Sequence, residues 1–577
     1  MSTIGAPPRT GNPSAGRSGA PRIGRWPAVG VGVVAVGLTL GVAELLAAVA
    51  AWLGLLNPAA SPFGSLGSAF ITITPEWLKD LGISLFGQSD KAALAVAMLV
   101  TFVIVAAAIG LIGRAYPVGA AALGAVLVAV TGAAILTRPA AGPADLIPML
   151  AGGAAGIGFL LHALRPPGDP YAAIHAAEAP GQDSAGSGAR WDAPDRRSVL
   201  RATGIAALAA AVAGGLSRVV PGVVDVQADR AAVTLPPVAG PSVEPPASTA
   251  ATRPGQPIHR PPARVTRSVP ALPAGVNPAV PGLTPYVTSN GSFYRVDTAF
   301  TVPRVTTEAW QLNVHGLVDR PFQLGWSELL AMPQVQRWLT LTCVSNEVGG
   351  NLAGNAAWQG VRISDILARA TPQAGADCVL STSADDFTVT TPLDVLTDGR
   401  DALLAFGMNG EPLPIEHGFP VRMVVPGLYG YVSATKWVVD LEVTRFSDAT
   451  AYWTDRGWAP RGPVKTASRI DTPGYDVTVG PRVVPVAGVA WAQHRGISAV
   501  QVQVDDGPWQ DATLAGTASK DTWRQWVLRW DTGDVAPGKH TLRCRAVDGS
   551  GAVQDATPRP PAPDGASGYH EVPVITR

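Results

Sequence analysis

The sequence has little cysteine, with three in 577 residues. None of the three belongs to a CxxC pair or is half of an obvious disulfide, and no CxxCH motif for covalent haem attachment occurs. Histidine is scarce in the long apolar runs, where His162 stands alone near the end of one run. A haem held by two histidines inside a helical bundle is therefore not expected, and His162 is interpreted as structural. No haem is predicted.

An excess of charge of either sign is also lacking. The chain has 43 basic and 43 acidic residues, a net charge of zero, and only 15% charged residues. Binding to nucleic acid needs a concentrated basic surface, so this class of partner is excluded. At 577 residues the chain is too long for one hydrophobic core, and several domains are expected.

Most of the long apolar runs lie before residue 220. A helix that crosses the hydrocarbon core needs about 20 largely uncharged residues, and four stretches qualify: 29–55, 91–113, 117–137 and 144–164. No polar face interrupts these runs, which disfavours buried core helices. A fifth and weaker run begins at Ile205 and is short and alanine-rich, like the apolar part of a signal sequence. Residues 70–87 mix charged and apolar side chains and are interpreted as an amphipathic interfacial loop.

The positions of the basic residues predict the orientation of these spans. Several arginines precede the first span and several follow the fourth in residues 165–204, while Arg114 lies between the second and the third. The positive-inside rule places these segments in the cytoplasm. Arg138, between the third and the fourth, is the exception. A fifth crossing then places everything after residue 220 outside. We therefore expect a multi-pass protein of the cytoplasmic membrane with an extracytoplasmic soluble half.

Residues 195–211, "DRRSVLRATGIAALAAA", resemble a twin-arginine export signal. Arg196 and Arg197 are followed by a basic Arg201 and then by a modest apolar run. A plain cluster of positive charges beside a membrane helix is an equal alternative. An export signal of this type implies a domain that folds before it crosses the membrane, usually because a cofactor must be inserted first.

The soluble half changes character along its length. Up to about residue 445, short apolar alternations are interleaved with helical patterns such as "ISDILARA", which predicts a mixed α+β domain. From about residue 470, strand patterns are separated by DG and PG turns with no helix signal, which predicts an antiparallel β-sandwich. The expected organisation is a cytoplasmic tail, a transmembrane region of about five spans, a Pro-rich linker without a fold of its own, a catalytic domain and a sandwich, over 1–26, 27–220, 221–284, 285–460 and 470–577.

Cys343 lies in "LTLTCVSNEVGG" (339–350), after an alternating run and before an asparagine and two glycines. A cysteine here is either a small core residue or a thiolate held at the end of a strand. Spacing alone favours the buried core residue. Cys378 and Cys544 lie inside strand patterns of different domains and are interpreted as core thiols.

Three segments carry a resemblance to a known family: "TLTCVSNEVGG" with "NAAWQGVRISDIL" (340–367), "MNGEPLPIEHGFPVRMVVPG" (408–427) and "TKWVVDLEV" (435–443). Followed by a β-sandwich, this ordered set resembles the sulfite oxidase family of molybdopterin-dependent oxidoreductases over residues 285–577. The resemblance implies an α+β core domain and an immunoglobulin-like C-terminal domain that mediates dimerisation in many members, hence a homodimer. It also implies that Cys343 ligates molybdenum, a suitable role for a soft thiolate, with Asn346 shaping the loop.

The implied cofactor is molybdenum-molybdopterin. His417 and Arg422 in "EHGFPVR" match family positions that grip the cofactor, and Thr435 and Lys436 match the basic positions before "KW". The stretch "SNGSFYRVDT" aligns less closely with the first cofactor-contacting loop of the family, through Tyr294, Arg295, Asp297 and Thr298.

The departures from the family concern the substrate. Two arginines follow the cysteine motif in sulfite oxidases, and one helps to bind the anionic substrate; here Glu347 and Val348 occupy those positions, and Trp458 falls where a tyrosine is expected. A substrate dianion would then face a carboxylate. The leading hypothesis is two-electron oxygen-atom transfer on a small sulfur or nitrogen oxide, with an unidentified electron partner. The alternatives are a sulfoxide reductase of the same family and a non-catalytic membrane-tethered binding or scaffold protein.

Overall fold

The computed structural model describes residues 23–53, 55–56, 61–74, 90–138, 141–164, 196–219, 225–238, 242–243, 269–299, 301–480 and 482–577. The chain divides into two compact units, Met1–Val223 and Val224–Arg577. Each unit is considered by itself.

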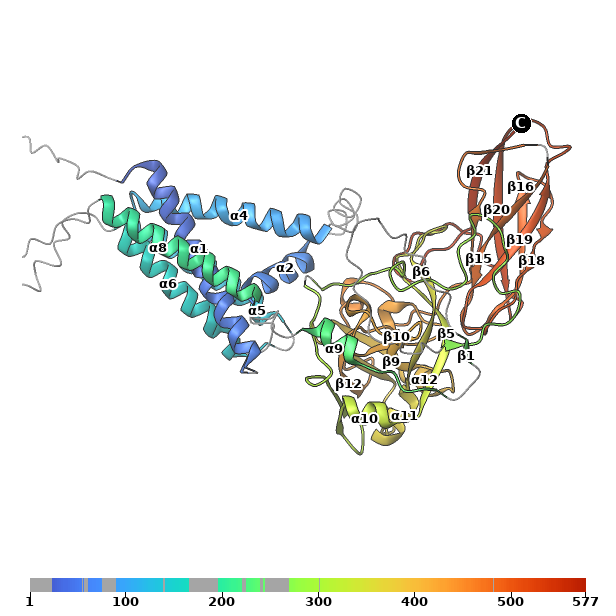
Figure 1. Ribbon diagram of the computed structural model, residues 1–577, viewed down its shortest axis with the longest axis horizontal. Helices are drawn as coiled ribbons and strands as arrows, with labels where there is room; N and C mark the ends of the chain where they lie inside the picture. The colour runs from blue at the N-terminus through green and yellow to red at the C-terminus, as the bar shows by residue number, and fades with distance from the viewer. Residues whose placement is uncertain are drawn as a thin grey trace, which may run out of the picture. The chain divides into compact units, whose positions relative to one another are not determined.

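The first unit is helical (Figure 1). Its helices are α1 (Arg25–Trp52), α2 (Pro62–Ile73), α4 (Asp90–Gly113), α5 (Pro117–Leu136), the 3₁₀ turn η3 (Pro143–Leu146), α6 (Ile147–Ala163) and α8 (Arg196–Val219). Within the described residues, four segments are long and apolar enough to cross a membrane: Arg25–Ala51, Ala93–Gly113, Pro117–Leu136 and Pro143–Ala163. They coincide with the four predicted runs.

The fifth predicted run lies in α8, whose apolar part is the shorter helix Thr203–Leu216. The predicted interfacial loop begins inside α2, and its residues 75–87 lie outside the described part of the chain. Helix α1 packs against α6 and α8 (Figure 1). Small residues permit the close approach of α1 and α6, because a methyl group added to Gly156 would lie 1.9 Å from the hydroxyl of Thr39.

The second unit begins with two sheets that share one core. One sheet has the order β10-β9-β6-β5 with β11 beside β9, and the other has the order β4-β3-β12-β7-β8. The strands are β3 (Gln311–Gly316), β4 (Phe322–Gly325), β5 (Gln334–Thr342), β6 (Ala353–Arg362), β7 (Cys378–Ser383), β8 (Thr388–Pro392), β9 (Leu403–Met408), β10 (Glu411–Pro412), β11 (Arg422–Val424) and β12 (Val438–Thr444). Helices α10 (Trp326–Ala331), α11 (Ile363–Ala370) and α12 (Leu393–Thr397) join them.

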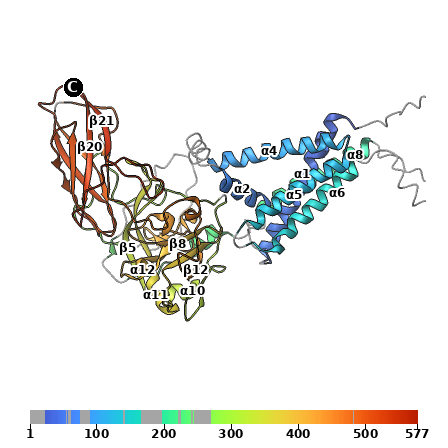
Figure 2. The same ribbon diagram turned by 180° about the vertical axis from the view of Figure 1, so that it is seen from behind.

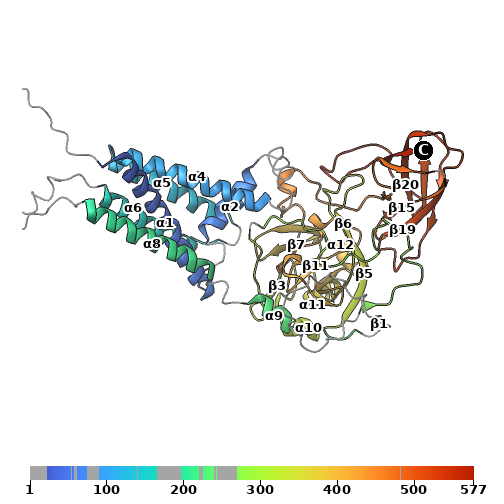
Figure 3. The ribbon, with the colours of Figure 1, turned by 45° about the horizontal axis from the view of Figure 1, so that its top comes forward.

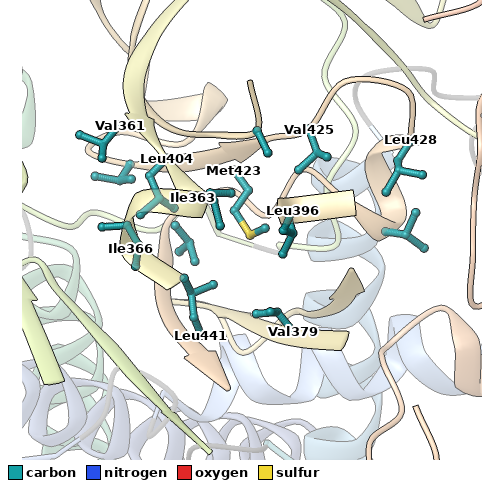
Figure 4. Close-up of a cluster of buried hydrophobic side chains, with 14 of the residues drawn as sticks. Val361, Ile363, Ile366, Val379, Leu396, Leu404, Met423, Val425, Leu428 and Leu441 are labelled. Atoms are coloured by element: carbon teal, nitrogen blue, oxygen red, sulfur yellow. The ribbon is translucent and has the colours of Figure 1, made fainter. Parts of the chain in front are cut away.

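The shared core is built from apolar side chains of both sheets and of α11 (Figure 4). Val361, Leu404 and Met423 point from one sheet toward Val379 and Leu441 of the other. Helix α11 places isoleucines at 363 and 366 and leucine at 367 on one buried face, as a 3.6-residue period requires. This mixture of helices and strands agrees with the predicted α+β character.

The C-terminal part, residues 467–576, is rich in strands and contains no helix among its described residues. Its sheets have the orders β13-β15-β19-β18 and β14-β21-β20-β16-β17. The strands are β13 (Ala467–Thr472), β14 (Val477–Val479), β15 (Val483–Trp491), β16 (Ile497–Val504), β17 (Gln510–Asp511), β18 (Thr513–Leu514), β19 (Arg524–Asp531), β20 (Gly538–Asp548) and β21 (His570–Thr576). Figure 2 shows β20 beside β21, and Figure 3 shows β15 beside β19. Side chains of both sheets, among them Val486, Trp526 and Leu542, form one separate core.

The two ends of the predicted linker pack on the second unit. Helix α9 (Val226–Ala232) buries Val226, and its Arg230 donates hydrogen bonds to the carbonyls of Pro412 and Leu413. Toward the other end, β1 (Ser242–Val243) pairs with β2 (Val269–Pro270), and Val269 is buried against Trp338. These ends therefore belong to a packed structure, and residues 244–268 lie outside the described part of the chain.

Candidate functional site

Cys343 directly follows β5, at the end of a strand paired along its length with β6. Its amide donates to the carbonyl of Leu352, and the Leu352 amide donates to Oδ1 of Asn346 at 2.7 Å. These bonds close residues 343–352 into a compact loop, here called the cysteine loop. Cys343 lines a cavity and is 8% exposed, and burial raises the pKa of its thiol. Without a compensating charge or metal the thiol stays protonated.

The cavity brings together most of the predicted site residues, which come from segments far apart in the sequence. Nine of them line it: Tyr294, Arg295, Asp297, Thr298, Cys343, His417, Arg422, Lys436 and Trp458. Two do not. Asn346 instead closes the cysteine loop, and Thr435 lies behind β11, where its hydroxyl is 2.7 Å from that of Ser381.

Arg422 is the most deeply buried cation of the cavity. It begins β11, is 6% exposed, and donates to the carbonyls of His417 and Ala434 at 3.1 and 3.3 Å. No carboxylate among the described residues forms an ion pair with it. Burial lowers its pKa from the ordinary 12.5 to about 10, so the charge persists at neutral pH but is poorly compensated. An anion entering the cavity would supply the missing partner.

Lys436 is the second buried cation. Its ammonium donates to Asp297 at 2.7 Å and to the carbonyl of Glu416 at 3.2 Å, while burial lowers its pKa to about 8. Asp297 also accepts from Arg295 at 2.7 Å, so two cations share one carboxylate. Gly418 makes this assembly possible, because its φ of 111° turns the chain where a Cβ would lie 3.0 Å from that of Arg422.

His417 adjoins these cations without adding charge. Its Nε2 donates to the carbonyl of Asn290 at 3.1 Å, which fixes the tautomer and leaves Nδ1 as an acceptor. Burial, reinforced by the neighbouring Arg422, lowers its pKa to about 4. Burial also raises the pKa of the Tyr294 hydroxyl above its ordinary range. Both groups are therefore neutral hydrogen-bonding groups at physiological pH.

An aromatic wall forms another side of the cavity. Tyr431 and Trp458 have ring centroids 5.8 Å apart, and Trp458 contacts Trp453 at 6.0 Å. Phe387 and Trp437 also line the cavity. Trp458 is the only member that sequence comparison predicted. Trp453 lies in the same short segment as Trp458, "YWTDRGW" (452–458). Phe387 and Tyr431 lie in turns far from it in the sequence, and no sequence pattern indicated that they belong to the site.

The prediction that Glu347 and Val348 face the substrate is wrong for this structure. Both line a separate depression between the cysteine loop and residues 466–468 and 566–568, and neither lines the cavity at Cys343. Glu347 is exposed, and Val348 is 38% exposed. Gly349, which follows them, has a φ of 77°, a conformation that favours glycine.

The donor set fits an anionic, sulfur-bound metal cofactor. Cys343 offers one soft sulfur, which suits a high-valent metal that already carries sulfur ligands. Arg422, Lys436 and Arg295 offer guanidinium and ammonium donors, the groups that bind phosphate. Arg295 and Lys436 share the carboxylate of Asp297, and Asp385 is a second carboxylate on the cavity wall, so three cations stand against two carboxylates. The cavity therefore favours a ligand that brings negative charge.

Comparisons with known proteins identify that ligand. Residues 299–453 match the family model described as the oxidoreductase molybdopterin binding domain. The chain is 37% identical over 153 residues to the uncharacterized oxidoreductase YuiH of Bacillus subtilis (strain 168), covering 26% of this chain and 74% of that protein. It is 29% identical over 324 residues to the mitochondrial sulfite oxidase of Homo sapiens, and 29% identical over 304 residues to nitrate reductase [NADH] 1 of Oryza sativa subsp. japonica.

The two longer matches are partial. They cover 48% and 42% of this chain, and the chain spans 58% of the human protein and 31% of the rice protein. The YuiH match, however, spans 74% of its relative. The chain belongs to the sulfite oxidase family of molybdenum-dependent oxidoreductases, and is an enzyme with molybdenum-molybdopterin as its cofactor.

Proposed function

We propose that this protein is a membrane-anchored, extracytoplasmic molybdenum enzyme that transfers an oxygen atom to or from a small sulfur compound. The observation that carries the proposal is the buried Cys343 thiol in one cavity with Arg422, a buried cation that forms no ion pair with a described carboxylate. A scaffold protein would have no use for such a costly arrangement. The family membership likewise supports an enzyme.

The residues of the chain have distinct roles in this proposal. Cys343 is the protein ligand of the molybdenum, and Asn346 holds its loop closed. Arg422 and Lys436 bind the anionic tail of the cofactor, while His417 and Tyr294 offer neutral hydrogen bonds to its ring system. Asp297 orients Arg295 and Lys436, Thr298 adds a hydroxyl to the wall, and Thr435 supports β11 from behind.

When bound, the cofactor supplies two-electron oxidation and reduction coupled to movement of one oxygen atom. Oxidation of sulfite consumes one water and releases two electrons and two protons, whereas reduction of a sulfoxide consumes two electrons and two protons and releases water. The chain contributes a site that excludes bulk water and orients the substrate beside Cys343. Trp458 is placed to form part of the substrate wall.

A sulfoxide reductase of the same family is the second candidate, and the aromatic wall favours it. Trp458, Trp453, Tyr431 and Phe387 offer apolar surface for an organic substituent, and sulfur contacts with aromatic rings are favourable. An inorganic anion gains nothing from that wall. Against this, Arg295 is a cation on the cavity wall that remains 39% exposed, so sulfite has a partner as well.

The proposed layout is tail 1–26, transmembrane region 27–220, linker 221–284, catalytic domain 285–460 and immunoglobulin-like domain 470–577, with both ends of the linker packed on the second unit. The single core shared by the two C-terminal sheets supports the last assignment, and dimerisation through this domain is part of the proposal. The four apolar helices support a membrane anchor. Residues 195–211 act as a twin-arginine export signal in this scheme, and α8 is the fifth span.

Steady-state kinetics of the purified full chain test the function. Molybdenum is measured by mass spectrometry, and turnover is measured with sulfite plus an artificial acceptor and with methyl aryl sulfoxides plus an artificial donor. Turnover of either class with stoichiometric molybdenum supports the proposal; absence of molybdenum from active preparations refutes it. Higher kcat/KM for sulfoxides would select the second candidate.

Topology needs its own experiment. Protease applied from the outer face should cut the C-terminal half of the wild type. Arg196→Lys together with Arg197→Lys should leave that half protected and the first four spans intact. Full accessibility in the double variant would mean that the arginines act only as a positive cluster.

A further inference from the structure

Strand β5, which ends one residue before Cys343, is an edge strand whose outer side is covered by the β-rich C-terminal part, residues 467–576. Strand β5 pairs with β6 on its inner side only. On its outer side, the Thr340 amide donates to the carbonyl of Asp521 at 3.0 Å, and its hydroxyl accepts from the amide of Trp523 at 2.8 Å. An edge strand left open would keep these groups unpaired and would be free to shift.

Gln493 completes this cover. It is fully buried, and its Nε2 donates to the carbonyl of Thr340 at 3.0 Å and to the hydroxyl of Thr342 at 2.9 Å. Thr342 is the last residue before Cys343. The side-chain amide of Gln493 therefore links the last residues of β5 to a loop of the β-rich part.

The far side of the cysteine loop is held by the same part of the chain. Arg469 is paired with Asp471 and donates to the carbonyl of Gly350 at 2.7 Å. The ring of His570 lies against Gly349, where an added Cβ would be 2.3 Å from its Nε2. His570 is itself fixed, because its Nδ1 accepts from the Ile470 amide and its Nε2 lies 2.8 Å from the Tyr475 hydroxyl.

We propose that the β-rich C-terminal part positions the Cys343 thiol, and that Gln493 is the positioning residue through which it acts on β5. The inference rests on the proposed role of Cys343 as the metal ligand. Residues 467–576 lie outside the matched molybdopterin segment 299–453, yet they contact both ends of the cysteine loop. Misplacement of a reacting group by about 1 Å lowers the rate up to about a hundredfold. A shift of the end of β5 would therefore change the position of the Cys343 sulfur at the metal and lower turnover.

The test compares two buried glutamines of the β-rich part. Gln493→Met removes the bridge to β5 without adding charge. Gln525→Met is the matched control, because Gln525 is equally buried but donates to Asn277 and to the carbonyl of Thr284 instead. Both full-length variants are purified in detergent with molybdenum quantified. The readouts are hydrogen exchange of residues 339–352 in cofactor-free protein, the paramagnetic resonance spectrum of the bound molybdenum, and kcat and KM.

Gln493→Met should speed exchange of residues 339–352 about tenfold, shift the resonance spectrum and lower kcat about tenfold with little change in KM. Gln525→Met should leave all of these as in wild type. Wild-type exchange and spectrum in Gln493→Met, or equal changes in both variants, would overturn the inference. If Gln493→Met does not fold, Gln493→Asn, whose amide is one methylene too short for the bridge, is judged by the same readouts. Cys343→Ser separates the two proposals: an unchanged metal spectrum there would refute the ligand role instead.

Discussion

Arg422→Met tests whether the Arg422 cation serves to bind the cofactor or to stabilise the fold. Burial lowers the pKa of Arg422 from 12.5 to about 10, which corresponds to about 3 kcal/mol of uncompensated desolvation in the cofactor-free protein. Hydrogen bonds from the guanidinium to three carbonyls at 3.1 to 3.3 Å offset part of this desolvation cost, each by about 0.5–1 kcal/mol. The two contributions nearly cancel. The free energy of unfolding of the cofactor-free variant should therefore stay within about 1 kcal/mol of wild type.

Cofactor retention should respond very differently. Removing one partner of a buried charge pair costs about 3–5 kcal/mol, or several hundredfold or more in affinity. Molybdenum content after extensive dialysis should fall to background in Arg422→Met. Arg469→Met is the stability control, because Arg469 is similarly buried but paired with Asp471, and its loss strands that carboxylate at a cost of about 3–5 kcal/mol.

The assay is thermal unfolding of the cofactor-free full chain in detergent, alongside molybdenum analysis of loaded protein. A large loss of stability in cofactor-free Arg422→Met, comparable to that of Arg469→Met, would refute the reasoning, because it would make Arg422 a structural cation. Retention of stoichiometric molybdenum by Arg422→Met would refute it equally.

Three further predictions concern pH, the cysteine loop and the aromatic wall. Burial holds the pKa values of His417 and His570 at about 4, below the 6.5 of the unfolded chain. Each histidine therefore contributes about 3 kcal/mol to the free energy of unfolding, fully present above pH 6.5 and lost as pH falls through 4. Replacing both by glutamine should flatten the fall of Tm over that window, and an unchanged slope would contradict this. Gly349→Ala should lower the free energy of unfolding by about 2–3 kcal/mol, because it adds a clash with His570 to a positive φ. Gly399→Ala, at a φ of 89° with open space around it, should lower it by only about 1 kcal/mol. Equal Tm shifts in the two variants would show that His570 does not constrain the loop. Trp458→Ala should raise KM at least about tenfold for aryl sulfoxides but little for sulfite, and equal effects on the two would remove the wall from substrate binding.

The sequence was informative wherever chemistry depends on a short segment. Spacing alone favoured a buried core residue at Cys343, and the family motifs were needed to group it with His417, Arg422 and Lys436. In each case the residues that meet in the cavity lie at the end of a strand or in a turn that the local pattern already indicates. The four apolar spans were predictable for the same reason, because length and composition decide them.

Orientation and long-range assembly were not predictable. Glu347 and Val348 lie four and five residues after Cys343, yet they line another depression. They stand beside Gly349, where a ring more than two hundred residues further along the chain lies against the backbone. Tyr431 lies against Trp458, and Phe387 lines the same cavity, only because separate turns pack together. Helix α9 is short and lies in a proline-rich segment, so no sequence pattern indicated that it would pack against Pro412 and Leu413.

The central claim, that Cys343 ligates the molybdenum, is tested most directly by X-ray absorption at the molybdenum edge. The spectrum is recorded for loaded wild type and for Cys343→Ser, which keeps the size of the side chain and replaces the soft sulfur by oxygen. The account predicts one sulfur ligand fewer in the variant, with an added oxygen ligand, no turnover and a fold unchanged in thermal unfolding. An identical sulfur count in the two proteins would contradict it and would return Cys343 to the role of a buried core thiol.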